Sequence, residues 1–189
     1  MAVAALLCPL LAGCSAERKR RVAFAQYNQA LQATDPGQAV ALVPGGAGER
    51  RAIERWVLLF SDLRSERVRL TAGEVYATDA YFGDALKAVR GIEAVEDHLA
   101  RRAEAVESCA LDIVDSFSHD GEYYFRWRMR VRFKGSTSGD SDSFIGMTHI
   151  RFGPEGKVVF HQDYWDASGG CFEKTSVPGR LLRAIKGKL

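Results

Sequence analysis

The sequence predicts an α+β fold in which a strongly curved antiparallel sheet wraps around helices from the N-terminal part of the domain. The first reason is the period of the apolar residues, which changes from helical spacing to strict alternation at about Cys109. The second is that Asp-Gly at residues 120–121 and Gly-Pro-Glu-Gly at 153–156 join later strands as hairpins. Helices followed by hairpin-linked strands are typical of proteins that carry their helices on one sheet face. We expect a cone-shaped domain with an open pocket.

Composition excludes several classes of function. The chain has 189 residues, 47% of them hydrophobic and 26% charged, which suits one domain with an extension and a sizeable core. A formal net charge of +2 is too small to indicate a nucleic-acid partner. The sequence has neither a glycine-rich phosphate loop nor a paired-cysteine zinc motif. We therefore predict no nucleic-acid partner, no metal and no cofactor.

The N-terminus resembles a bacterial lipoprotein signal. Residues 1–14 form an uncharged apolar run, short for a membrane span, that ends in the lipobox-like sequence Leu-Ala-Gly-Cys. A lipid on Cys14 would tether the protein to a membrane and place it in the cell envelope, on the periplasmic side. The alternatives are an uncleaved anchor or a mis-assigned N-terminal extension, and without a genuine lipobox we expect a cytoplasmic protein. Residues 15–48 are predicted to form a flexible tether with a short helix at 22–33, because Pro-Gly sequences interrupt any longer helix.

The expected domain covers residues 49–189 and begins with helices. A helix is predicted from about Glu49, because an apolar stripe follows at helical spacing: Ile53, Trp56, Val57, Phe60 and Leu63. A shorter helix at 65–75 and a pair of short strands at 76–91 come next. Gly91 precedes a third helix, whose apolar face comprises Ile92, Val95, Leu99, Ala103 and Val106.

Four strands are predicted after the helices, at residues 109–118, 123–133, 143–152 and 157–168, followed by a short basic tail helix after Val177-Pro178-Gly179. In the second strand, apolar residues alternate with an arginine stripe formed by Arg126, Arg128, Arg130 and Arg132. We expect the apolar series on the concave face and the arginine stripe outside. There it would pair with acids such as Asp112, Asp142 or Asp166, or lie at a dimer interface.

This order of elements resembles the nuclear transport factor 2-like superfamily, and more closely its SnoaL-like polyketide cyclase and ketosteroid isomerase branch. The resemblance is carried by Tyr-Ala-Thr-Asp-Ala-Tyr-Phe-Gly-Asp at 76–84, the helix led by Gly91, and the sequence from Ile150 to Asp166. It covers about residues 49–189 and implies a bacterial, cone-shaped domain of unsettled activity.

The resemblance also implies positions for catalytic groups. Asp84 occupies the position at which steroid isomerases of this fold carry their catalytic base. The position of the acid that stabilises an oxyanion falls on Thr148, and the nearest counterpart of the helix tyrosine is Trp56. A base is therefore retained while both oxyanion donors are missing, and losing one such donor typically costs about 10²–10³ in rate. This departure argues against ketosteroid isomerase activity.

Residues 161–166, His-Gln-Asp-Tyr-Trp-Asp, place an imidazole, two carboxylates, a phenol and an indole within six positions. On a strand, His161, Asp163 and Trp165 share one face. In the resembled fold the tryptophan of this strand faces the cavity, which implies that His161 and Asp163 face it near Asp84. A histidine beside a carboxylate can act as a general base. The alternative is that His161 and Asp163 only satisfy each other's hydrogen bonds at the pocket floor.

Three functions remain open at this point. The first is binding of an apolar molecule of steroid-like or polyketide-like size, in a pocket formed by Phe82, Trp127, Phe144, Thr148 and Trp165. The second is an isomerase, cyclase, dehydratase or hydrolase that uses Asp84 or the His161–Asp163 pair as base. The third is a dimeric interaction domain that associates through the outer sheet face.

The remaining titratable residues receive structural interpretations. His98 lies on a charged helix and is predicted at the surface, while His149 alternates away from Thr148 and should face outward. Cys109 and Cys171 are predicted to be thiols. A disulfide between them is the alternative in an oxidising compartment.

Overall fold

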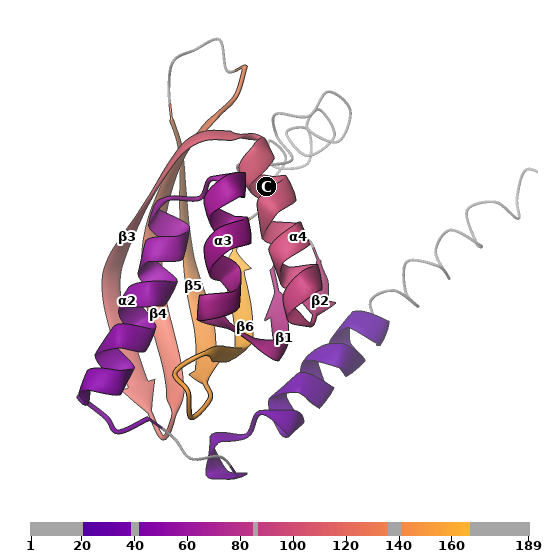
Figure 1. Cartoon of the computed structure of the whole chain (residues 1–189), viewed down its shortest axis with the longest axis vertical. Coiled ribbons are helices and arrows are strands. Elements are labelled where there is room, and N and C mark those ends of the chain that lie inside the picture. The colour runs from indigo at the N-terminus through magenta and orange to yellow at the C-terminus, as the bar shows by residue number, and fades with distance from the viewer. Residues whose placement is uncertain (1–20, 39–41, 85–86, 136–140, 167–189) are drawn as a thin grey trace, which may run out of the picture.

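A six-stranded sheet with helices on its concave face forms the domain (Figure 1). The computed structural model describes residues 21–38, 42–84, 87–135 and 141–166. The helical elements after the N-terminal helix at 21–33 are η1 (Pro36–Gln38), α2 (Ala47–Ser61), α3 (Ser65–Val75) and α4 (Ile92–Glu104). The strands are β1 (Tyr76–Gly83), β2 (Ala88–Arg90), β3 (Val106–His119), β4 (Glu122–Phe133), β5 (Asp142–Phe152) and β6 (Val158–Trp165). The predicted α+β cone is confirmed.

One part of the predicted topology is wrong, because the sheet is mixed rather than antiparallel. Its order is β2-β1-β6-β5-β4-β3, and β1 runs parallel to β6 while the other neighbours are antiparallel. The chain leaves β1 through β2 and α4, enters the sheet again at its far edge, and returns by hairpins. A connection that contains a helix allows parallel pairing. Alternation along a strand shows which face is buried but not which way its neighbour runs.

The apolar stripes bury themselves as predicted and form one core between the helices and the sheet. Trp56 of α2 is fully buried and stacks on Phe125 of β4, with ring centroids 4.8 Å apart. Val95 and Leu99 of α4 are also buried in this cluster. Burial of such side chains stabilises the fold by about 1.5–3 kcal/mol each. The core therefore fixes α2 and α4 over the sheet and leaves the site between them and the strand ends.

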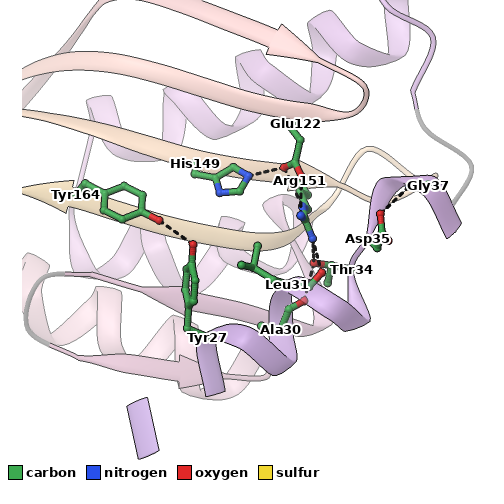
Figure 2. A network of polar contacts seen from close by, with 10 residues as sticks. All are labelled: Tyr27, Ala30, Leu31, Thr34, Asp35, Gly37, Glu122, His149, Arg151 and Tyr164. Atoms are coloured by element: carbon green, nitrogen blue, oxygen red, sulfur yellow. Dashed lines mark hydrogen bonds and ion pairs between the residues drawn. The ribbon is translucent and has the colours of Figure 1, made fainter. Parts of the chain in front are cut away.

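Residues 21–34 correct the prediction of a flexible tether. The expected short helix forms, but it packs on the outer face of the sheet, where Ala30 is buried in a small cluster with Tyr81 and Phe160. Figure 2 shows the polar contacts that fix it. Arg151 of β5 donates from Nη1 to the Leu31 carbonyl at 2.6 Å and to Thr34 Oγ1 at 3.0 Å. A cation at these carbonyls also complements the helix dipole.

The same arginine is held by a half-buried carboxylate on the neighbouring strand. Its Nε and Nη2 donate to the two carboxylate oxygens of Glu122 at 2.8 and 2.6 Å, and His149 contacts the same carboxylate. His149 does point outward, as predicted, yet it is only 5% exposed because the helix covers this part of the outer face. The N-terminal helix is thus joined to the sheet by a charge-assisted network that sequence alternation does not reveal.

The arginine stripe lies outside, as predicted, and pairs mainly with the edge strand β3. Arg130 pairs with Asp112 at 3.3 Å, as expected, and Arg126 and Arg132 pair with Asp115 and Glu107. These exposed pairs contribute little stability. A dimer across this face stays a prediction.

Several predictions fall on residues that the structure does not describe. They include the signal with Cys14, the tail helix and Cys171. Within the described ranges, no helix has both the length and the apolar character needed to cross a membrane.

We predict that Arg151→Met lowers the free energy of unfolding by about 3 kcal/mol. The change leaves the Glu122 carboxylate without its cation and removes the donor to the Leu31 carbonyl, and breaking a buried ion pair typically costs this much. Chemical denaturation measures the loss. Arg130→Met is the matched control, because it breaks only an exposed pair with Asp112. Equal stabilities of the two variants would contradict the prediction.

We predict that His149→Gln flattens the fall in stability between pH 7.5 and pH 5. Burial lowers the pKa of His149 from 6.5, although Glu122 partly opposes this. As the pH falls, the unfolded chain therefore binds a proton at this histidine before the folded protein does. The stability that neutral His149 contributes is thus lost as the pH falls below about 6.5. Burial acts to raise the pKa of Glu122, but hydrogen bonds from Arg151 and His149 outweigh it and lower that pKa, so its contribution is lost only below about 4.5. The measurement is the denaturation midpoint of the variant and of the wild type at both pH values. An equal fall of the midpoint in the two proteins would contradict the prediction.

Candidate functional site

A cavity of about 360 Å³ opens between α2, α4 and the ends of the strands. Its lining comprises Phe60, Leu63, Phe82, Asp84, Leu99, Arg102, Ala105, Val106, Met129, Val131, Phe133, Phe144, Asp163 and Trp165. Eleven of these residues are apolar, and the other three are the charged residues Asp84, Arg102 and Asp163. An apolar cavity of this size with a few convergent polar groups is the usual form of a small-molecule site.

Asp163 of β6 stands at the end of a chain of hydrogen bonds that crosses the sheet. Trp127 donates its indole N–H to Thr148 Oγ1 at 2.8 Å, and the Thr148 hydroxyl donates to Asp163 Oδ1 at 2.5 Å. Gly146 makes room for this arrangement, because a Cβ there would lie 2.5 Å from the Trp127 ring. Neither Trp127 nor Thr148 lines the cavity. Both lie behind its wall and orient the carboxylate that does.

His161 supports the same carboxylate oxygen from the other side. Its Nε2 lies 2.8 Å from Asp163 Oδ1, and its Nδ1 lies 2.8 Å from the Tyr76 hydroxyl. With Asp163 ionised and the imidazole neutral, the network assigns the proton to Nε2, and Tyr76 then donates to Nδ1. Burial and the nearby Asp163 raise the pKa of Tyr76 well above its ordinary value, which keeps this hydroxyl protonated. Fully buried, His161 does not itself reach the cavity.

These contacts leave one oxygen of Asp163 uncommitted. Both hydrogen bonds are accepted by Oδ1, and no residue in the described part of the chain donates to Oδ2. Because Asp163 lines the cavity and its side chain is 15% exposed, this oxygen is available to a bound molecule. The arrangement can accept a hydrogen bond or a proton from a ligand.

Asp84 also lines the cavity, but its oxygens are engaged by the protein. Oδ1 accepts the Lys87 backbone N–H at 2.8 Å. Oδ2 lies 2.9 Å from His98 Nε2 and 2.9 Å from an Arg102 nitrogen. The Asp84 side chain is only 2% exposed. The prediction that His98 lies free at the surface is therefore wrong, because α4 directs its imidazole inward onto Asp84.

The structure brings together some of the predicted site residues and separates others. Phe82, Asp84, Phe144, Asp163 and Trp165 line the cavity, whereas Trp127, Thr148 and His161 lie behind it. Sequence reasoning missed three participants: Tyr76, His98 and Arg102. The motif at 76–84 begins with Tyr76 and could have indicated it. Arg102 carried no such signal, because a basic residue in the last turn of a helix is ordinarily solvated.

Two further residues are excluded from acid–base roles by burial. Trp56, in the position of the isomerase tyrosine, is 1% exposed and does not line the cavity. Among the described residues its indole N–H finds no acceptor of hydrogen-bonding geometry. It lies near enough to Tyr76 to act to lower the pKa of that hydroxyl, against the dominant effect of burial. Cys109 is a thiol whose pKa burial raises to about 11, so it is not a nucleophile at neutral pH.

Comparison with known families agrees with the fold described above. The family model described as SnoaL-like domain matches residues 53–161, which include most of α2, all of α3 and α4, and the sheet as far as His161 in β6. No curated protein matches the chain.

Solved structures share the fold at low sequence identity. A hypothetical protein with a ketosteroid isomerase-like fold from Catenulispora acidiphila, in complex with trimethylamine, is 17% identical, with a TM-score of 0.54 over 62% of this chain and 86% of that chain. An LEH-like epoxide hydrolase from Mycobacterium tuberculosis is 15% identical, with a TM-score of 0.52 over 66% and 86%. A candidate SnoaL-like polyketide cyclase from Jannaschia sp. CCS1 is 16% identical, with a TM-score of 0.53 over 66% and 91%. Identities this low show a common fold alone.

Proposed function

Because this chain belongs to the SnoaL-like domain family, we propose that its cavity binds a small, mostly apolar molecule of steroid-like or polyketide-like size. The observation that carries the proposal is the cavity of about 360 Å³, whose wall is aromatic and aliphatic except at Asp84, Arg102 and Asp163. An apolar ligand would remove this wall from water, at about 25 cal/mol for each Å² buried. The charged groups would then select the polar part of the ligand.

The free oxygen of Asp163 favours a second candidate function, which is acid–base catalysis of the isomerase, cyclase or hydrolase type. Asp163 lines the cavity, its Oδ1 is held by Thr148 and His161, and its Oδ2 accepts no hydrogen bond from the described residues, which is the arrangement a general base needs. Similar structures named as an epoxide hydrolase and as a candidate polyketide cyclase make such chemistry compatible with the fold. Asp84 is the weaker candidate, because Lys87, His98 and Arg102 already occupy its oxygens.

We predict that Trp165→Ala weakens ligand binding but costs clearly less stability than Trp127→Ala. Trp165 lines the cavity and is only partly buried, whereas Trp127 is 5% exposed and donates to Thr148. Truncating a core tryptophan costs about 3–5 kcal/mol, and a residue on a cavity wall already lacks neighbours on one side. Native mass spectrometry against steroid-like, polyketide-like and fatty compounds, with chemical denaturation of each variant, provides both readouts. Ligand uptake unaffected by Trp165→Ala, together with a full core loss of stability, would rule out the cavity as the binding site.

We predict that Asp163→Asn lowers the turnover of any substrate found by that survey by at least about 10²-fold, because amides do not accept a proton. Asp84→Asn should weaken binding and stability more than the chemical step, since Asp84 holds Arg102 and His98. The pH–rate profile distinguishes the roles of Asp163 and Asp84. The variant that lacks the general base should lose the limb of the profile that reports ionisation of that base. Wild-type turnover by Asp163→Asn would refute the catalytic role and leave the binding role intact.

A further inference from the structure

Asp163 carries the unbalanced charge of the cavity wall. Among the described lining residues, two carboxylates stand against one guanidinium, and Asp84 and Arg102 pair with each other at 2.9 Å. The titratable group that contacts Asp163 is His161, which is neutral in the proton arrangement assigned above. With the histidines neutral, these lining residues leave one negative charge in an apolar space, and it lies on Asp163.

Hydrogen bonds stabilise this carboxylate as an anion and leave it an open acceptor. Thr148 Oγ1 accepts the Trp127 indole N–H at 2.8 Å, so the single hydroxyl hydrogen of Thr148 is directed to Asp163 Oδ1. Asp163 Oδ2 accepts no hydrogen bond from the residues that the structure describes. An ionised oxygen without a partner is costly in apolar surroundings, so a ligand that supplies both a donor and a positive charge gains most here.

Aromatic side chains near the carboxylate add a second attraction for a cation. Trp165 follows Asp163 by two residues on the same face of β6, and Phe144 stands edge to face against it, with ring centroids 5.6 Å apart and planes at 82°. The aromatic residues of the lining are Phe60, Phe82, Phe133, Phe144 and Trp165. The face of an aromatic ring attracts a cation, and the attraction is larger where water is excluded. An ammonium group is therefore matched by both the charge and the rings of this wall.

We propose that the ligand of this cavity is an apolar amine in its protonated form, whose ammonium N–H donates to Asp163 Oδ2. The inference rests on the first proposed function, binding of a small, mostly apolar molecule, and names the polar group of that molecule. A neutral ligand would leave the charge of Asp163 without a counterion, and an anion would be repelled by it, since charges are weakly screened in apolar surroundings. Arg102 does not reverse this preference, because Asp84 already compensates its charge.

The number of N–H groups narrows the class of amine. A tertiary ammonium has one N–H, which matches the oxygen of Asp163 that the described residues leave open. A primary ammonium would keep two more N–H groups among apolar side chains, and an unpaired buried donor is costly. A quaternary ammonium keeps the charge but has no N–H. The wall therefore suits a protonated tertiary amine with apolar substituents.

Four naphthalene compounds that differ in one group test the inference. The ammonium probe is 2-(dimethylaminomethyl)naphthalene, which is protonated at neutral pH, and 2-isobutylnaphthalene is its uncharged isostere. The corresponding trimethylammonium compound removes the N–H, and 2-naphthylacetate reverses the charge. Equilibrium dialysis against the wild-type protein gives the four dissociation constants. We expect the ammonium probe to bind at least about tenfold more tightly than the isostere and the trimethylammonium compound, and 2-naphthylacetate to bind most weakly.

Asp163→Asn provides the second arm of the test, because the amide removes the charge while its oxygen can still accept the hydrogen bonds of Thr148 and His161. The ammonium probe should lose its advantage over the isostere in this variant. Binding of the isostere should persist, which shows that the cavity is intact. Asp97→Asn is the matched control and should change neither affinity, since Asp97 is an exposed carboxylate on α4 that pairs with Arg101.

The outcomes separate this inference from the function on which it rests. The inference is overturned if the isostere or the trimethylammonium compound binds the wild type as tightly as the ammonium probe, or if the advantage of the ammonium probe survives Asp163→Asn. The proposed binding function stands in each of these cases. If none of the four compounds binds the wild type, the binding function itself fails and the inference fails with it. The wild-type comparison decides between these outcomes even if Asp163→Asn does not fold.

Discussion

The hydrogen-bond chain from Trp127 through Thr148, Asp163 and His161 to Tyr76 is the constraint on which the site depends. It links β4, β5, β6 and β1 through the interior of the sheet. Each donor and acceptor in it is buried or nearly so, and an unpaired member would cost about 1–3 kcal/mol. The chain therefore fixes strand register and carboxylate orientation together. A polar network inside an apolar core is tolerated only when it is complete, and this one satisfies Oδ1 of Asp163 while Oδ2 accepts no hydrogen bond from the described residues.

Two carboxylate–guanidinium pairs lie on different faces of the same sheet. On the concave face, Asp84 holds Arg102 at the cavity wall. On the outer face, Glu122 holds Arg151 against the carbonyls at the end of the N-terminal helix. In both, a carboxylate fixes a guanidinium that still has donors for another group. Arginine suits this role because its planar, permanently charged fork can bind two partners at once.

Sequence periodicity predicted the elements and faces well, because burial imposes it directly. The alternation of β6 placed His161, Asp163 and Trp165 on the interior face, and the stripe of α2 placed Trp56 in the core. The pairing of Asp84 with His98 could not be predicted, since it depends on how β1 and α4 meet in space. The docked helix at 21–33 was missed because its partner surface, Tyr81 and Phe160, lies on a face that alternation marks as solvent-exposed.

The parallel pairing of β1 with β6 joins the first and the last strand of the described part of the domain. Tyr81 of β1 is opposite Phe160, and Phe82 is opposite His161, about eighty residues later in the chain. Contacts of such separation form late, because a long loop must close first. On the ribosome, β1 would wait for its neighbour until β6 has emerged. The cavity wall and its carboxylate would then arise in the final step of folding, so a chain truncated before Asp163 would lack both that carboxylate and part of the strand that joins β1 to β5.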